Sequence, residues 1–577
     1  MFRHLANLYI QKLIASLAQT HQNELVVCWD NFDYNQGVRH QTLDEPSKHV
    51  SATTGKLCIG RGIPAGGLQR SMLHLDVKLT SPDIWNADGN KEDEILYNCQ
   101  RYWIAEAIRY THRTAVESVF DRDNSMLWPE LPSVERLPVH QTHNYTLSPI
   151  LENEGTISGT YKVIDEIFTG QLNLDREKEF NGPLWLVFGD QKTVSLVRTV
   201  QKERQEAGHP YDQYKWLLPV PGLFHWRTNY IDMIHDTYSG SESAATESTL
   251  YHNKNVLGCI QGHKSPFHHK EEVATRAFDA RVTACFYRSL PAQVRPADCS
   301  QVDNYIHNLG CATFMKKVDE IREYIFLAKE QSDPVDEEFL AHARFLQLME
   351  TYKTLKLAIK LGDVGLIKRV LARCCLLFHG SGQSKYAFLS LYMTWLTQTG
   401  AADKVLQDAI LANGLVNLRG AKDSHFEMDR LNELLNLEFR TLVALRRAST
   451  MEISELFRRA ALTASYCTRL KVDFEATFGE YSNGRHQVKD ASTEVRNLAF
   501  QIWSSDSIIK QPHGRSSPFK PRDVLQKGVA KLNIGVDKFN KSVVEGRWEE
   551  DQDLADATST PVAVLDDIVN LDDDDIE

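Results

Sequence analysis

Two aspartates stand where short apolar runs end, a position at which metal-dependent chemistry is often built. Asp30 closes the run ELVVCWD, and Asp190 closes GPLWLVFGD. In parallel-type sheets, ligand and catalytic groups collect at the carboxyl ends of strands. Two such acids and a third from a helix can hold one or two Mg²⁺ ions for phosphodiester chemistry, because hard cations take oxygen ligands. Strand-ending aspartates are also ordinary caps and turn formers, so spacing alone leaves both interpretations open.

The elements that would position these acids are indicated by hydrophobic patterning. Short β-branched and apolar runs predict strands over residues 24–30, 55–60, 73–79, 182–191 and 214–222. Periodic apolar residues predict helices over residues 92–120, 159–172, 194–207 and 223–238, and residues 127–150 have the Pro- and His-rich composition of a loop. This order predicts an α/β sheet with helices on its faces. Beyond residue 239 the pattern becomes mostly helical, and it includes a helix that begins near Met428.

Charge is concentrated at one end of the chain. Of the net charge of −12, residues 545–577 hold thirteen acidic side chains and one arginine, so the body is about neutral. A neutral body without a basic stripe gives no footprint for strong nucleic-acid binding, although local patches can form in the fold. No run approaches the roughly 18 apolar residues of a membrane span. The absence of such a run indicates no membrane association, and the scattered cysteines, without any C-x-x-C, indicate an intracellular, reducing compartment.

A series of motifs runs along most of the chain, from Leu25 to Lys541. In order they are WDNFDYNQGVRHQTLDEPSKHVSATTGKL, SGTYKVIDEIF, LWLVFGDQKTVSLVR, PGLFHWRTNYIDMI, IKLGDVGLIKRVL, LFHGSGQSKYA, LVNLRG and MDRLNELLN. Together they resemble the landmarks of a fungal, transposon-derived family called domain of unknown function 6589. Members of that family are similar to cut-and-paste transposases of the hAT type.

The resemblance implies a fold and a division of the chain. The fold would be α/β, with a ribonuclease-H-like mixed sheet interrupted by a large helical insertion, and with a helical C-terminal region. The acidic, aromatic-poor composition of the tail predicts that it is disordered. The expected segments are an N-terminal helix (1–23), the first part of the core (24–238), a mostly helical insertion (239–418), a helix completing the core with C-terminal helices (419–544), and the tail (545–577).

The resemblance also implies site residues. Asp30 and Asp190 become the first and second metal-binding acids, and Glu433, which lies in an E-x-x-N landmark, becomes the third. These three would be catalytic and would ligate Mg²⁺ or Mn²⁺. Asp33 is an alternative to Asp30 for the first position, and Glu438 is an alternative to Glu433 for the third, because each lies only a few residues away in the chain.

Other residues are candidates for contact with DNA. His225 resembles the histidine of a Cys-x-x-His motif in hAT-type proteins, but Gly222 stands where that motif has its cysteine. Arg39, His40 and Lys56 follow the first acid in a polar stretch that suits either a phosphate backbone or ordinary solvated turns.

The acidic tail suggests a second function. The run VLDDIVNLDDDDIE resembles a SUMO-interacting motif, with apolar residues that fill a groove and acids that meet its basic rim. The residues of this motif are Ile568, Val569, Leu571, Asp572 and Asp573. The alternative is a solubilising tail in which these apolar residues have no role.

The resemblance predicts a DDE-type, transposase-like protein with metal-dependent DNA chemistry if it is active, and we expect an inactive or domesticated member. Because the first core strand begins near Leu25, we expect that an upstream DNA-binding domain has been lost or omitted. The rival function is a nuclear interaction protein that keeps the fold as a scaffold and binds SUMO through the tail. The oligomeric state is left open.

Overall fold

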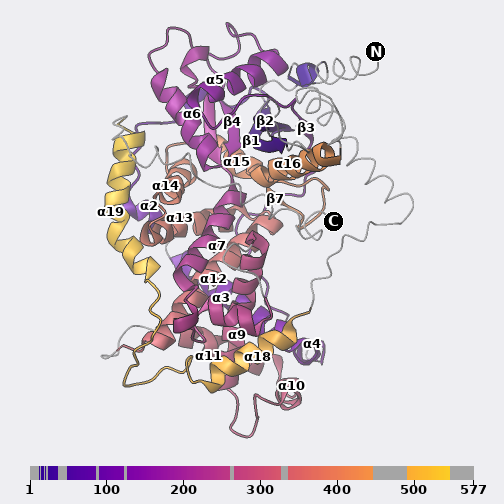
Figure 1. Ribbon diagram of the computed structural model, residues 1–577, viewed down its shortest axis with the longest axis vertical. Helices are drawn as coiled ribbons and strands as arrows, with labels where there is room; N and C mark the ends of the chain where they lie inside the picture. The colour runs from indigo at the N-terminus through magenta and orange to yellow at the C-terminus, as the bar shows by residue number, and fades with distance from the viewer. Residues whose placement is uncertain are drawn as a thin grey trace, which may run out of the picture.

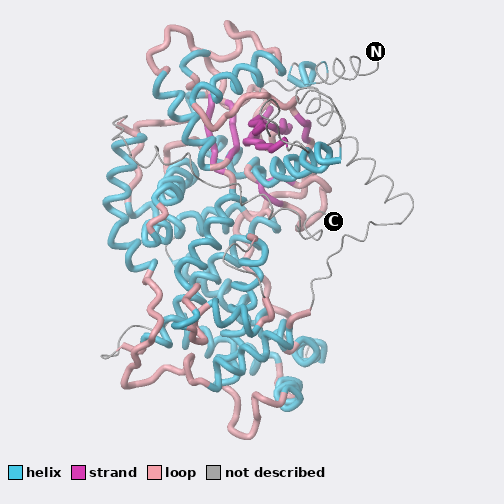
Figure 2. Tube along the Cα trace, viewed as in Figure 1, coloured by secondary structure: helices cyan, strands magenta, loops and turns pink. Residues whose placement is uncertain are grey.

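The computed structural model places a small sheet at one end of an elongated, mostly helical molecule (Figure 1). The strands are confined to that end, and helices continue to the other (Figure 2). The residues that the structure describes are 12, 14–18, 20, 24–36, 48–85, 90–122, 127–259, 266–326, 335–445 and 490–545. None of the helices within these ranges is both long enough and apolar enough to cross a membrane.

Five strands form one mixed sheet in the order β3-β2-β1-β4-β5. Their bounds are β1 (Leu25–Gln36), β2 (Lys48–Ile59), β3 (Asn144–Thr146), β4 (Trp185–Gly189) and β5 (Leu217–Pro221). The strands β1 and β2 form a long antiparallel pair, and β3 runs antiparallel to β2. On the other side, β1 runs parallel to β4, and β4 runs parallel to β5. The first strand is therefore central, and it is shared between the antiparallel and parallel halves.

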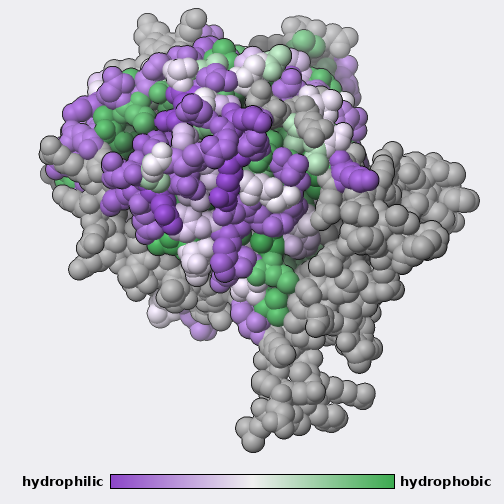
Figure 3. Space-filling model, turned by 90° about the horizontal axis from the view of Figure 1, so that it is seen from above, coloured by the Kyte–Doolittle hydropathy of each residue, from purple (hydrophilic) through white to green (hydrophobic). Residues whose placement is uncertain are grey.

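Alternation along the strands divides the core into two layers. Val27 and Trp29 face the cluster built with α5 (Ile157–Asp165) and α6 (Gln191–Glu203). Val26 and Cys28 face the larger cluster, to which α7 (Leu223–Tyr238), α15 (Lys404–Asn413) and α16 (Met428–Leu445) contribute. Because side chains alternate with a period of two, Asp30 shares the face of Val26 and Cys28. The surface seen over α5 and α6 is mostly hydrophilic (Figure 3).

The remaining helices extend away from the sheet. They are α2 (Ser81–Trp85), α3 (Asn90–Thr111), α4 (Arg113–Arg122), α8 (Leu250–Val256), α9 (Phe267–Arg288), α10 (Cys299–His307), α11 (Cys311–Phe326), α12 (Glu337–Leu361), α13 (Val364–Ser381), α14 (Ser384–Gln398), α18 (Ser492–Ser504) and α19 (Val524–Val543). A two-stranded ribbon, β6 (Leu415–Val416) and β7 (Phe426–Glu427), precedes α16. The helix α3 packs against α9, α4 packs against α10, and α18 packs against α9, so the helical part includes segments from before and after residues 239–418.

Three local predictions differ from the structure. The first strand continues beyond Asp30 to Gln36, because every residue of β1 pairs with β2 and the ladder does not need apolar side chains. Residues 73–79 do not form a strand, and their backbone is held by side chains instead: Trp395 Nε1 donates to the Val77 carbonyl at 2.7 Å. Residues 144–146, expected in a loop, form β3 at the edge of the sheet.

Two of the motifs mark helix boundaries. In the GDV motif, the Asp363 carboxylate accepts from Leu366 N at 3.0 Å and begins α13, and it also accepts from the Val134 and Glu135 backbone N–H groups at 2.9 and 3.0 Å. In the GSG motif, a Cβ on Gly380 would lie 1.7 Å from the Val524 carbonyl oxygen of α19. A side chain there would push α19 away from α13.

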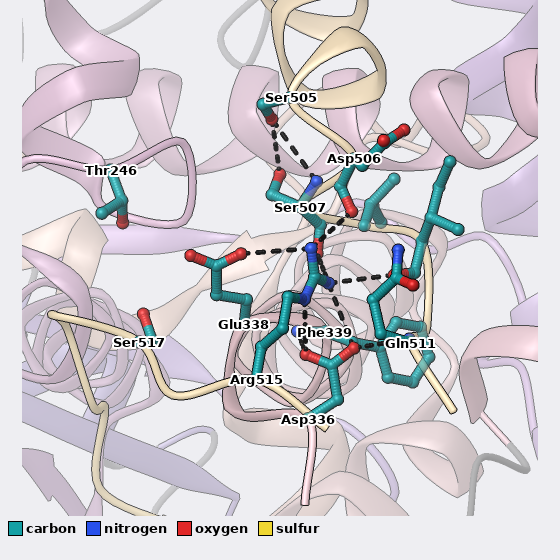
Figure 4. A network of polar contacts seen from close by, with 12 residues as sticks. Thr246, Asp336, Glu338, Phe339, Ser505, Asp506, Ser507, Gln511, Arg515 and Ser517 are labelled. Atoms are coloured by element: carbon teal, nitrogen blue, oxygen red, sulfur yellow. Dashed lines mark hydrogen bonds and ion pairs between the residues drawn. The ribbon is translucent and has the colours of Figure 1, made fainter. Parts of the chain in front are cut away.

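Arg515 ties the segment between α18 and α19 to the start of α12 (Figure 4). Its guanidinium donates to the buried carboxylate of Asp336 at 3.1 and 3.2 Å and pairs with Glu338 at 3.3 Å. It also donates to the carbonyls of Ser507 and Ile509. Asp336 also caps α12, so its ion pair with Arg515 joins the start of α12 to the segment between α18 and α19.

Glu271 joins three helices within the helical part. Its carboxylate on α9 pairs with Arg227 of α7 at 3.0 Å and with Lys356 of α12 at 3.1 Å. Tyr352 also donates its hydroxyl hydrogen to this carboxylate. Burial by itself raises the pKa of Glu271, but the charges of Lys356 and Arg227 lower it to about 2.

Replacing Arg515 with methionine should destabilise the protein by about 3–5 kcal/mol, because the Asp336 carboxylate would stay buried without its cationic partner. Urea unfolding followed by tryptophan fluorescence measures the change. The control is Lys520→Ala, which removes an ion pair of 2.8 Å with Glu337 whose lysine is 61% exposed, and which should cost under about 1 kcal/mol. Equal unfolding midpoints for the two variants would contradict this role of Arg515.

The Glu271 carboxylate should make stability depend on pH in acid. It is ionised in the native state down to about pH 2 but takes up a proton near its ordinary pKa of 4.5 when unfolded. Its stabilisation is therefore complete above pH 4.5 and is lost as the pH falls towards 2. Glu271→Gln should lower the stability by about 3 kcal/mol at neutral pH, and the gap from wild type should close in acid.

Thermal unfolding midpoints measured between pH 7 and pH 3 test this expectation. Glu177→Gln is the control, because that side chain is 78% exposed. A gap between wild type and Glu271→Gln that stays constant over the range would show that the carboxylate has no depressed pKa.

Candidate functional site

Two carboxylates and an imidazole converge between the sheet and two helices. Asp30 comes from β1, His225 from the first turn of α7 and Glu433 from α16. One ligand atom from each lies within 4.8 Å of the others. The His225 Nε2 atom is 3.3 Å from Glu433 Oε1. The structure thus brings together two of the three predicted acids and adds the histidine.

A polar network fixes α16 on the long strand pair. The Thr54 hydroxyl of β2 donates to Asn436 Oδ1 at 2.5 Å and accepts from Asn432 Nδ2 at 3.3 Å. Asn436 Nδ2 donates to the Asn31 carbonyl of β1 at 3.4 Å. Since Asn432 and Asn436 flank Glu433 on the same helix, these bonds set the register in which Glu433 meets Asp30. This is the physical role of the E-x-x-N motif.

Asp429 joins α16 to the start of α7. Its carboxylate accepts from the backbone N–H groups of Phe224 and His225 at 3.1 Å, and so caps α7 from another helix. A Cβ on Gly222 would lie 2.1 Å from Asp429 Cγ. The position therefore has no room for the cysteine of a Cys-x-x-His motif. Burial raises the pKa of Asp429 to about 6, and the positive charge of His225 acts in the opposite direction.

Asp190 lies beside this cluster rather than within it. Its carboxylate caps α6 by accepting from Thr193 N at 2.7 Å. The Thr193 hydroxyl in turn donates to Glu154 Oε1 at 3.0 Å, and Glu154 is buried. The negative charge of Asp190 raises the pKa of both Asp30 and Glu154, so Asp190 lies within electrostatic reach of both carboxyl groups. The second predicted acid is therefore an electrostatic neighbour that also serves as a helix cap.

Glu154 is a fourth acid that the sequence did not reveal. Burial, followed by the charge of Asp190, raises its pKa to about 8. It lies in an irregular stretch between β3 and α5, where neither periodicity nor a strand end points to a buried acid.

The three side chains of the cluster shift one another's pKa values. Burial and then the charge of Glu433 raise the pKa of Asp30 well above its usual range, and this carboxyl shares a hydrogen bond with Glu433. Burial opposes ionisation of Glu433, but the hydrogen bond and charge of His225 lower its pKa. Burial likewise opposes protonation of His225, yet Glu433 raises its pKa to about 9. At neutral pH an imidazolium therefore balances the Glu433 carboxylate.

The rival acids point elsewhere. Asp33 lies on the opposite face of β1 from Asp30, where it accepts from the Ser51 hydroxyl at 2.6 Å and lies 3.5 Å from His49 Nε2. Glu438 lies within electrostatic reach of Lys56, and its charge favours the protonated lysine. These placements favour Asp30 and Glu433 over their rivals.

The basic residues predicted to contact DNA are placed differently. Lys56 is 8% exposed and donates to Thr146 Oγ1 at 2.9 Å and to Asn144 Oδ1 at 3.2 Å, so its ammonium joins β2 to β3. It therefore does not offer a surface charge to a phosphate backbone. Arg39 and His40 lie outside the described residues.

The predicted tail motif also lies outside the described residues. This applies to Ile568, Val569, Leu571, Asp572 and Asp573. Its role in binding SUMO stays a prediction from the sequence.

Oxygen atoms in this region suit a cation. Glu433 Oε2 and Asn432 Oδ1 are buried and have no hydrogen-bond partner among the described residues. Buried acceptors without donors are uncommon, because each loses its hydration without compensation. Carboxylate and amide oxygens are ligands for Mg²⁺ and Mn²⁺, and a nearby imidazole suits Mn²⁺ as well. The donor set therefore fits the predicted metals.

Fold and site together define an α/β protein in which acids and a histidine converge on the central strand of a mixed sheet. The chain belongs to the family of unknown function DUF6589, which it matches over residues 75–486. Asp190, His225 and Glu433 lie inside the matched region, whereas Asp30 lies before it. Comparisons with curated proteins and with solved structures find no significant match.

Replacing Gly222 with alanine should destabilise the protein by about 1–3 kcal/mol, because the new methyl group would force Asp429 away from the start of α7. Gly208→Ala is the control, since a Cβ there meets nothing within 4 Å. The comparison uses thermal unfolding of the two variants. If both alanines had the same small effect, the tight contact between α7 and α16 would be refuted.

Proposed function

We propose that this protein is a transposon-derived, DDE-type transposase-like protein whose acid cluster supports metal-dependent DNA phosphodiester chemistry. The observation that carries the proposal is the meeting of Asp30 with Glu433. Their neighbours Asn31 and Asn436, which hydrogen bond to each other, are 405 residues apart in the chain. Two carboxyl groups from such distant segments face one another in a largely buried place, and a cation that displaced the proton favoured on Asp30 would make both of them oxygen ligands.

The arrangement of the chain supports a ribonuclease-H-like core with a helical insertion. The central strand carries the first acid, the residue after β4 is the second, and a helix packed on the sheet carries the third. Helices α8 to α15 stand between α7 and α16, where hAT-type enzymes carry their insertion. A fungal origin and a nuclear location belong to the same proposal.

A bound divalent cation would polarise a phosphodiester and activate water for attack on it. Asp30 and Glu433 would hold this cation, with Asp190 on the side of α6. The chain's own contribution is orientation. Asn432, Asn436 and Thr54 keep Glu433 over β1, while His225 holds one of the Glu433 oxygens.

We infer that this member is inactive or domesticated rather than mobile. The Asp190 carboxylate caps the N-terminus of α6 by accepting from Thr193 N, and the Glu433 carboxylate is already paired with His225. Both contacts compete with metal ligation. Weak cation binding with little cleavage is therefore the expected behaviour.

Calorimetric titration of the full chain with Mn²⁺ and Mg²⁺ tests the site. Asp30→Asn and Glu433→Gln should each weaken specific binding by about 10- to 100-fold, because each removes a charged ligand oxygen. Asp190→Asn should have a smaller effect. Asp33→Asn is the matched control, because it removes an acid from the same strand on the opposite face.

The four variants share the same acidic tail, so its nonspecific binding cancels in the comparison. Affinities that are equal in wild type, Asp30→Asn and Glu433→Gln would show that the acids do not form a metal site. Nicking of supercoiled DNA by wild type, with loss in both variants, would show that the site is active and would contradict the inference of inactivity.

A further inference from the structure

The helix α19 uses only one of its sides for packing. Figure 1 shows α19 along one side of the molecule, next to α13 and α14. Its inner side is apolar, with Val524, Leu532, Val536 and Phe539 buried, and it packs against α13 and α14. The side chains on its other side are exposed.

Four lysines and one isoleucine form a single row on the exposed side. They are Lys527, Lys531, Ile534, Lys538 and Lys541, which follow one another at intervals of three or four residues and so lie on one face of the helix. All five are exposed, and Ile534 is 62% exposed. At about 1.5 Å per residue, this lysine row is about 21 Å long.

Within the part of the chain that the structure describes, none of the four lysines of the row forms an ion pair. Exposed lysines elsewhere, such as Lys162 and Lys178, are held by acids at 3.0 Å. Of the acids at this helix, Glu545 is used by Lys78 at 2.9 Å, and Asp537 is the single acid that α19 itself contains. The row therefore keeps an excess of positive charge.

This arrangement of charge is unfavourable for an isolated helix. Like charges three or four residues apart on a helix repel one another and destabilise it. Lys527 and Lys531 are such a pair, and Lys538 and Lys541 are another. Solvation accounts for each exposed lysine singly, but a partner with regularly spaced negative charge would also remove the repulsion between them.

The composition of the lysine row distinguishes between kinds of anionic partner. A membrane surface needs a broad apolar face on the helix that binds it, whereas the apolar side of α19 is buried and the row offers Ile534 alone. A DNA duplex presents one phosphate per about 3.4 Å of each strand, so about six phosphates of one strand lie along about 21 Å. Four ammonium groups spread over that length suit such a ladder of charges.

We propose that the lysine row of α19 binds the phosphate backbone of a DNA duplex without reading its sequence. Contacts to phosphates position a duplex but carry no information about the bases. In Figure 1, α19 and α16 lie on different sides of the molecule, so the row would hold flanking duplex rather than the reacting phosphate. The choice of DNA rests on the proposed function, whereas the row itself does not depend on the acid cluster or on a metal.

Fluorescence anisotropy of a short labelled duplex, measured with the full chain in EDTA between about 50 and 200 mM salt, tests the proposal. Lys531→Gln combined with Lys538→Gln should weaken binding by about tenfold or more and lower the slope of log K against log salt by about 1.8, because two phosphate contacts are lost. Lys531→Arg combined with Lys538→Arg should keep the wild-type affinity. Lys162→Gln combined with Lys178→Gln is the matched control, since it removes the same charge from another exposed surface, and should bind like wild type.

The outcomes separate the lysine row from the acid cluster and from other partners. Asp30→Asn should leave the affinity for duplex unchanged, so failure of the metal site does not affect this result. Equal affinities and salt slopes for the glutamine variant of α19 and its control would overturn the proposal. Tighter binding of phosphatidylserine vesicles than of duplex would overturn it as well. If duplex bound only after Asp572→Asn combined with Asp573→Asn, the row would belong to the acidic tail instead of DNA.

Discussion

The contact between α16 and β1 is the constraint on which the rest of this structure depends. Glu433 reaches Asp30 only because α16 returns to the central strand after the intervening helices α8 to α15. Apolar packing brings the helix to the sheet, as when Phe439 meets Phe32 with ring centroids 6.0 Å apart. Such packing allows small sliding movements, whereas hydrogen bonds have narrow geometry. The bonds from Thr54 and Asn436 therefore define the register that packing alone would leave loose.

The same contact creates an electrostatic problem that the surrounding residues solve. A buried carboxylate pair is unfavourable unless one member is neutral or a cation lies nearby. Here the raised pKa of Asp30 favours its neutral form, and His225 supplies the positive charge. Asp429 places His225 by capping α7, and Gly222 leaves space for that cap. The glycine in place of a cysteine is thus part of another arrangement of the site rather than a simple loss.

Much of this arrangement could be predicted where the signal is local. The strands β4 and β5 and the helices α7 and α16 are apolar or periodic segments, and their pattern indicates them. Local signals failed where tertiary contacts decide the secondary structure. Residues 73–79 resemble a strand, but contacts from helices hold their backbone in another conformation. The strand β1 continues through polar residues because β2 pairs with it. Asp30 and Glu433 were paired through a family resemblance, and no spacing rule would have joined them. The roles of Glu154 and Lys56 follow from burial, which a single sequence does not reveal.

The shared use of α7 links two polar sites mechanically, the acid cluster at His225 and the ion pair of Arg227 with Glu427. His225 and Arg227 stand two residues apart, so they project to different sides of a helix whose length and packing make it move as a unit. Its first turn is held by Asp429 of α16, and Arg227 is held by Glu427, which directly precedes α16. A shift of α16 would therefore displace the anchors of both sites together. The acid cluster and the ion pair of Arg227 with Glu427 are separate in chemistry but are supported by the same two helices.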